Sequence, residues 1–230
     1  MSLLTICQNV ATNCGFPQPA LIIGNPDTTA AMLLALINKG GKRLARKPWQ
    51  VLRKEYTFST AIGTPSYALP SDYGWFENDT AWDRTMFWKM RGSLSAEEWQ
   101  RYKSGVMSTT PRARFRIKNN LIFIDPTPTA IDSLVIEYIS KKWVFDGAST
   151  YYPNFQNDGW TSLIDEDLIE LELTWRFLNR KGLAYAEERD ELERQLDIIF
   201  AHDVPKDTVN QATRNEPWPP LPTVPITGYS

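Results

Sequence analysis

The chain has 230 residues, of which 42% are hydrophobic and 23% are charged, a composition typical of a soluble globular protein. A net charge of -2 and a pI near 5.6 give no overall attraction to nucleic acid or anionic membranes, so dedicated DNA binding is disfavoured. The N-terminal segment lacks the basic region of a signal peptide, and the longest apolar run, residues 30–37, is too short to span a bilayer.

The N-terminal segment predicts two helices. Apolar residues recur at helical spacing over residues 3–14. Asp27 is expected to cap a second helix, which ends before Pro48. We expect Gly40 and Gly41 to bend or interrupt this helix.

The middle of the chain predicts antiparallel strands. From Gln50 the hydrophobic period changes from that of a helix to two, which indicates a strand. A further strand is expected over residues 82–90, and residues 133–140 are expected to form a ribbon with residues 143–145.

Two local motifs in this region have a clear physical basis. Asn119 and Asn120 tolerate the positive φ angles of a tight turn, so residues 112–124 predict a hairpin. Ser95 and Glu98 have the spacing of a capping box and predict the start of a short helix.

Two more helices are expected near the C-terminus. Ser162 and Asp165 have capping-box spacing, and Gly182 separates the first helical stripe from a second one. The prolines after Val204 predict an extended arm. The expected class is therefore α+β, a helical bundle with an inserted antiparallel β-module, and its segments are N-terminal helices 1–49, β-module 50–150, C-terminal helices 151–204 and arm 205–230.

The sequence offers no catalytic or metal-binding constellation. Cys7 and Cys14 would lie roughly 10 Å apart on one helix, too far for a disulfide. His202 is the sole histidine, so neither a zinc-type ligand cluster nor a histidine-based catalytic pair is expected. Two pairs of adjacent glutamates, Glu97 with Glu98 and Glu187 with Glu188, could in principle act as catalytic acids. The side chains of each pair would point about 100° apart on a helix, so they cannot flank one bond. We expect no enzyme activity and no cofactor.

Tryptophan is the more informative residue type, because nine of them exceed what one small core requires and aromatic residues anchor interfaces. The residues that we expect at an interface with another protein chain are Arg84, Phe87, Trp88, Trp99 and Trp143. The residues that we expect to form a partner-binding arm are Trp218, Pro219, Pro220, Leu221 and Tyr229. A basic cluster at the end of the second helix could contact DNA or an acidic partner, and it comprises Lys39, Lys42, Arg43, Arg46 and Lys47.

Four segments together resemble a known family. They are DTAWDRTMFW at 79–88, LSAEEWQRYKSG at 94–105, RFRIKNNLIFIDPTP at 114–128 and EYISKKWV at 137–144. In this order they resemble the head-to-tail adaptors of short-tailed bacteriophages, also called tail tubular protein A.

This resemblance implies a virion structural protein, made in the host bacterial cytoplasm, that forms a ring of about twelve subunits. The ring would sit at the head-tail junction between the portal protein and the tail nozzle protein, with genome DNA passing through its lumen in non-specific contact. The resemblance implies that the expected interface residues contact the nozzle or a neighbouring subunit, that the arm binds the portal, and that the basic cluster lines the lumen or meets a partner. Two alternatives are a tail-associated lytic enzyme, which peptidoglycan turnover would reveal, and a single-stranded DNA-binding module, which would show steeply salt-dependent affinity.

Overall fold

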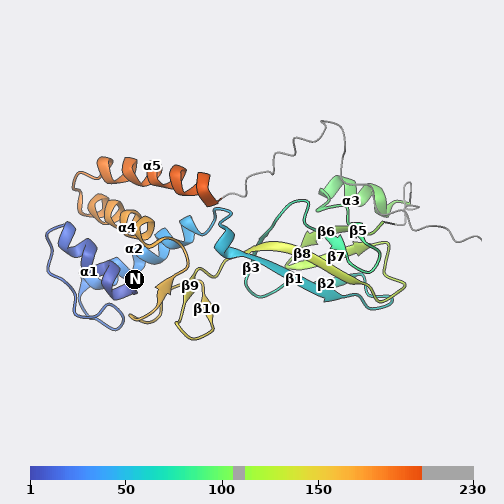
Figure 1. Ribbon diagram of the computed structural model, residues 1–230, viewed down its shortest axis with the longest axis horizontal. Helices are drawn as coiled ribbons and strands as arrows, with labels where there is room; N and C mark the ends of the chain where they lie inside the picture. The colour runs from blue at the N-terminus through green and yellow to red at the C-terminus, as the bar shows by residue number, and fades with distance from the viewer. Residues whose placement is uncertain (106–111, 204–230) are drawn as a thin grey trace, which may run out of the picture.

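The structure is a computed structural model that describes residues 1–105 and 112–203. Figure 1 shows an elongated molecule, with α1, α2, α4 and α5 at one end and α3 with most of the strands at the other. The helices and antiparallel strands confirm the mixed α+β class. Each end has its own cluster of buried apolar side chains, so the molecule has a helical part and a β part with separate cores.

The helical part is organised around one helix. Helix α4 contacts each of the other three helices, and the four are α1 (Leu3–Asn13), α2 (Thr28–Leu44), α4 (Glu166–Lys181) and α5 (Ala186–Asp203). Leu168, Leu173 and Phe177 of α4 are buried in the same cluster as Leu33 and Ile37 of α2. The core therefore joins the beginning of the described chain to its end.

Side-chain caps set where these helices begin. Asp27 accepts a hydrogen bond from the backbone N–H two residues on, which confirms it as the N-cap of α2. The capping box expected for Ser162 is wrong, because Asp165 is itself the N-cap of α4. Its carboxylate reaches the backbone N–H groups of the second and third helical residues. Ser162 instead accepts from the backbone of Ile164, ahead of the helix.

Two glycines inside α2 make room for other side chains. The helix runs unbroken to Leu44, so the expected interruption at Gly40 and Gly41 is wrong. A Cβ atom at Gly41 would lie 2.0 Å from the indole of Trp143, and one at Gly40 would lie 2.6 Å from Cγ of Glu172. Close packing of these two side chains against the backbone therefore offsets the cost of about 1 kcal/mol for each helical glycine.

A five-stranded antiparallel sheet forms one layer of the β part. Its central strand β8 pairs with β1, β3 and β4, and β4 pairs with β5; the strands are β1 (Arg53–Ser59), β3 (Tyr73–Phe76), β4 (Trp82–Asp83), β5 (Trp88–Lys89) and β8 (Ser133–Ser140). Tyr56 and Phe58 of β1 pack on the core while Glu55 and Thr57 are exposed, as the two-residue period predicts. A short 3-10 turn, η1 (Gln50–Leu52), precedes β1, so the strand begins three residues later than expected.

The second layer is a three-stranded sheet of β2 (Ser66–Ala68), β6 (Arg114–Lys118) and β7 (Leu121–Asp125). The hairpin of β6 and β7 is confirmed, with φ angles of 52° at Asn119 and 58° at Asn120. Phe115 and Ile122 from this sheet share a core with Ile136 of β8. Helix α3 (Ala96–Lys103) follows the capping box that the sequence predicts.

One expected strand pairing is wrong, and the difference shows where the two parts join. Strand β9 (Val144–Phe145) pairs with β10 (Tyr151–Tyr152) and β11 (Thr161–Ser162) rather than with β8. Trp143 and Val144 are buried in the helical core, which draws this segment away from the larger sheet. Ile139 belongs to the helical core while Ile136 belongs to the β core, so β8 runs from one core into the other.

Candidate functional site

The strand expected over residues 82–90 is a short hairpin instead, because only its two ends pair, as β4 and β5. The buried carboxylate of Asp83 accepts hydrogen bonds from the backbone N–H groups of Thr85 and Met86, at 2.9 Å each. An aspartate that bonds to the backbone two and three residues on stabilises a turn in place of a continuous strand. The alternation of faces expected across this segment therefore does not form.

The tip of this hairpin exposes three consecutive apolar side chains. The exposed fractions are 48% for Met86, 78% for Phe87 and 39% for Trp88. Phe87 has a φ of 58°, in the left-handed region that favours glycine and asparagine and is unusual for a bulky side chain. Folding therefore gives no reason for a phenylalanine at this position.

Two ion pairs orient the hairpin on the sheet. Arg84 lies 2.8 Å from Glu55, and Nζ of Lys89 lies 2.7 Å from Oδ1 of Asp79. Such exposed pairs contribute little to stability, so their main consequence is to fix geometry. Beside the hairpin lies a groove of about 550 Å³, whose apolar lining comes from Trp82, Val135 and Phe87.

Two of the five residues expected at the interface are buried inside the chain. Trp99 is 9% exposed on the inner face of α3. Trp143 is fully buried, and its ring meets that of Phe155 edge-on with centroids 5.1 Å apart. The structure therefore groups Arg84, Phe87 and Trp88 at the surface, places Trp143 in the helical core, and buries Trp99 beneath α3.

The basic cluster at the end of α2 is also divided between roles. Arg43 donates to the buried carboxylate of Glu172 at 3.2 Å and to Glu193 at 3.0 Å, so it ties α2 to both α4 and α5. Nζ of Lys47 lies 5.5 Å from the ring centre of Phe200 on α5. These two cations take part in packing between helices.

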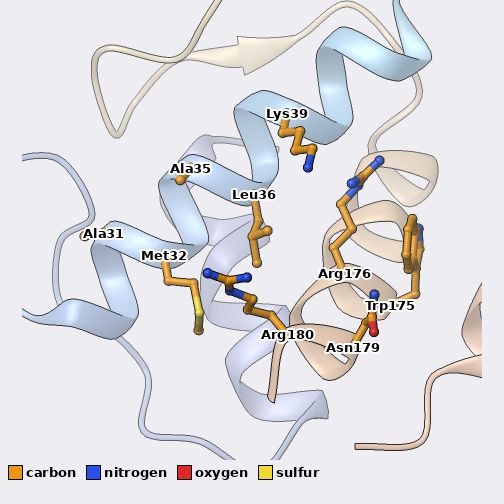
Figure 2. Close-up of a pocket in the computed structure, with 9 residues that line it drawn as sticks. All are labelled: Ala31, Met32, Ala35, Leu36, Lys39, Trp175, Arg176, Asn179 and Arg180. Atoms are coloured by element: carbon orange, nitrogen blue, oxygen red, sulfur yellow. The ribbon is translucent and has the colours of Figure 1, made fainter. Parts of the chain in front are cut away.

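The three remaining cations of the cluster face outward. Lys42 and Arg46 are exposed, and Lys39 lines a groove of about 820 Å³ between α2 and α4 (Figure 2). The other lining residues are Ala31, Met32, Ala35, Leu36, Trp175, Arg176, Asn179 and Arg180. The lining thus combines an apolar α2 side with three cations and holds no acidic residue. In a chain of net charge -2, this groove is a local concentration of positive charge.

A buried carboxylate that we did not predict fixes one wall of this groove. Glu172 is 1% exposed and accepts hydrogen bonds from Arg176 Nε at 2.6 Å, from Trp175 Nε1 at 2.9 Å and from Arg43. The guanidinium of Arg176 also lies 4.6 Å from the ring centre of Trp175. The sequence signal was an acid four residues before an arginine within an otherwise apolar stripe.

A second buried carboxylate, Asp72, lies in the β part. It accepts hydrogen bonds from Lys54 at 2.7 Å, Tyr138 at 2.8 Å and Ser140 at 3.0 Å. Burial opposes ionisation of Asp72, but these hydrogen bonds and the charge of Lys54 outweigh it and hold the pKa of Asp72 below its usual value. Burial, together with the Asp72 charge, raises the pKa of Tyr138. This cluster is internally satisfied and joins β1, β8 and the loop before β3.

Comparison with known proteins identifies the family. A family model described as SU10 adaptor protein matches residues 1–217. The chain belongs to this family of phage adaptors. A search of curated proteins found no match. A phage adaptor is a structural component of the virion, and its role implies contacts with other virion proteins such as portal and tail. The resemblance to phage adaptors is thereby confirmed.

Three side chains of the adaptor that are often reactive in enzymes, Cys7, Glu98 and His202, have different surroundings: the first is buried, the second caps a helix and the third is exposed. Desolvation and the charge of Asp158 raise the pKa of the buried Cys7 to about 12, so its thiol stays protonated. Glu98 completes the capping box of α3, and His202 is exposed in the last turn of α5. Over residues 1–105 and 112–203, no group of three or more His, Cys, Asp or Glu side chains could hold a metal ion. A structural family fits the expectation of no enzyme activity.

Two other expectations concern membranes and the C-terminal arm. Among the helices of the described ranges, none has the length and apolarity of a membrane-spanning segment. The adaptor is described as far as Asp203, whose carboxylate accepts from the backbone N–H of Gln50 at 2.8 Å. The residues predicted for the portal-binding arm lie outside the described part of the chain; they are Trp218, Pro219, Pro220, Leu221 and Tyr229.

Proposed function

We propose that copies of this adaptor form a ring of about twelve subunits at the head-tail junction, between the portal and the tail nozzle, with genome DNA passing through the lumen. The observation that carries this proposal is the family match over residues 1–217, and the resemblance of four segments to tail tubular protein A supports it. The elongated shape adds support, because its two ends can contact different neighbours (Figure 1).

The hairpin of β4 and β5 is the best candidate for contact with the nozzle or a neighbouring subunit. Exposed aromatic anchors supply most of the binding energy in protein interfaces, and contiguous exposed apolar side chains mark such sites. Phe87 and Trp88 meet this description, and Arg84 can pair with a carboxylate at the rim. Trp99 and Trp143 would contribute by holding the fold, because both are buried.

The same proposal assigns roles to the other segments. Helices from residues 1–49 and 151–204 would form the bundle, into which the β-module of residues 50–150 is inserted. Exposed Lys42 and Arg46 are candidates for non-specific contact with DNA in the lumen. Residues 215–230 would dock on the portal or an adjacent subunit, since the prolines around Trp218 restrict the free chain and reduce the entropy lost on binding.

A density map of the tail vertex of the phage particle tests the ring and its position. We expect about twelve copies of this chain between the portal and the nozzle. A different location in the particle would overturn the proposed position, and absence from the particle would overturn the structural role.

Truncation tests the arm. A chain ending at Thr213 should keep the melting temperature of the full-length protein, because the removed residues contribute little to the core, but it should lose binding to purified portal protein. Unchanged binding of the truncated chain to portal and to full-length adaptor would refute the proposed role of the arm.

A further inference from the structure

The groove between α2 and α4 has the properties of a binding surface for an acidic segment. Its cations are Lys39, Arg176 and Arg180, and no carboxylate balances them in the lining (Figure 2). Glu172 neutralises Arg176 from beneath, but within the described residues neither Lys39 nor Arg180 forms an ion pair. The α2 side offers Met32 and Leu36 as an apolar surface. A partner for this groove must therefore carry both carboxylates and an apolar side chain.

Helix α5 of the same chain carries a surface of this kind. The helix has seven carboxylates and two arginines over its 18 residues. Its inner face is set by Leu192 and Leu196, which are fully buried. At 100° per residue, Asp190 and Asp197 lie on the opposite face, and the row of exposed residues agrees. Arg194 also lies on this face, where it pairs with Glu191 at 2.8 Å. Ile198, beside Asp197, is 59% exposed, so the outer face combines an excess of acids, one paired arginine and an exposed apolar residue.

The outer face of α5 cannot reach the groove of its own chain. The inner face is held against α4 and the end of α2 by the buried leucines, by the ion pair of Arg43 with Glu193, and by the edge-on contact of Phe200 with Trp49. In Figure 1, α4 lies between α5 and the other two helices of this part. The acidic face therefore points away from the groove and is available only to another molecule.

We infer that the groove between α2 and α4 of one copy receives the outer face of α5 of a second copy. Asp190 and Asp197, two helical turns or about 10 Å apart, pair with Lys39 and Arg180, and Ile198 packs on Met32 and Leu36. Because the two surfaces are different parts of the chain, the contact is heterologous and repeats from copy to copy, which generates a ring or a filament. The inference rests on the proposed ring and names the contact that builds it.

Nucleic acid is a poorer match for the same groove. A phosphate backbone is satisfied by cations and polar donors, whereas the α2 side of the groove is lined by Met32, Leu36 and two alanines. An acidic segment of a different virion protein has the right chemistry, but the complementary surface found in the described structure is on α5.

Charge exchange tests the contact. A groove-reversed variant, Lys39→Glu with Arg180→Glu, and a helix-reversed variant, Asp190→Lys with Asp197→Lys, should each lose self-association at least about tenfold, because like charges then face one another. A mixture of the two variants, or one chain with all four substitutions, should restore association. Self-association is measured by sedimentation at low ionic strength and, within assembled particles, by photo-crosslinking from position 198.

The control for the groove-reversed variant has the same change in net charge elsewhere, Arg101→Glu with Lys118→Glu, both exposed in the β part. This control should associate like the unmodified chain, and all variants should show the same circular dichroism and unfolding midpoint. The crosslink from position 198 should map to Met32 or Leu36 of a second copy. Failure of the mixture to restore association, or a crosslink to another virion protein or to nucleic acid, overturns the inference. The proposed ring is tested separately, by the density map of the tail vertex.

Discussion

The two parts of the molecule break the usual separation of polar and apolar side chains in opposite ways. In the helical part, the carboxylate of Glu172 is buried, and three hydrogen-bond donors from α2 and α4 satisfy it. In the β part, Met86, Phe87 and Trp88 face solvent on a turn whose geometry disfavours Phe87. The first exception is explained within the chain, because its partners are all present. The second has no explanation in folding, which is why we propose it as a contact with another virion protein.

An exposed tryptophan, Trp88, and a buried one, Trp143, should differ most in what their replacement costs in stability. Trp143→Ala should lower the free energy of unfolding by roughly 3 to 5 kcal/mol, because it removes a fully buried ring packed on the backbone at Gly41. Trp88→Ala, its matched control on the hairpin, should cost about 1 kcal/mol or less. Chemical denaturation of both variants measures the difference. Equal costs would show that the β4–β5 hairpin is part of the folded core.

The buried carboxylate gives the next largest effect. Glu172→Gln should cost roughly 3 kcal/mol, because it leaves Arg176, which is 12% exposed, without its counter-charge. Arg43 pairs with both Glu172 and Glu193. Glu193→Gln removes the exposed one of these two partners and should cost less than about 1 kcal/mol. Urea unfolding at neutral pH compares the two. If both substitutions cost the same, the charge of Glu172 does not contribute more than a surface ion pair.

The Asp72 cluster predicts a dependence on pH. The folded-state pKa of Asp72 is lowered, so its ionised form contributes stability that is fully present above the usual aspartate pKa of about 3.9. That contribution is lost as the pH falls through the folded-state value. Asp72→Asn should therefore cost roughly 2 kcal/mol at pH 7 and progressively less below pH 4. Denaturation curves over this range measure the gap between variant and parent, and a gap that stays constant would contradict the assignment.

The hairpin tip should show the smallest effect on stability and a large effect on binding. Phe87→Gly removes a bulky side chain at a positive φ, so the free energy of unfolding should change by about 1 kcal/mol or less, in either direction. Recruitment of nozzle protein or of neighbouring subunits should fall at least about tenfold. Val51→Ala, at an exposed apolar residue of the turn η1, is the control and should bind normally. Normal recruitment by Phe87→Gly would remove the tip from the proposed interface.

Local sequence signals determined much of the secondary structure and the family. The Asp27 cap, the Ser95 capping box and the turn at Asn119 and Asn120 were predictable, because each depends on hydrogen bonds or backbone preferences within a few residues. That the chain is a phage adaptor was predictable from four motifs in a fixed order. The hairpin at residues 82–90 was not predictable, because the hydrogen bonds that Asp83 accepts from the backbone, which turn the chain, compete with an equally plausible strand pattern.

Tertiary structure alone decided which side chains meet partners and which fill the cores. Trp88 and Trp143 both occur among charged and apolar neighbours, but only the packing of Trp143 against a glycine of α2, about one hundred residues earlier, buries it. Glu172 and the groove beside it depend in the same way on α2 and α4 lying together. A periodic pattern specifies which face of a helix is apolar, whereas the element that covers that face is set by contacts between distant residues, so burial and the surfaces left open could be known only from the folded chain.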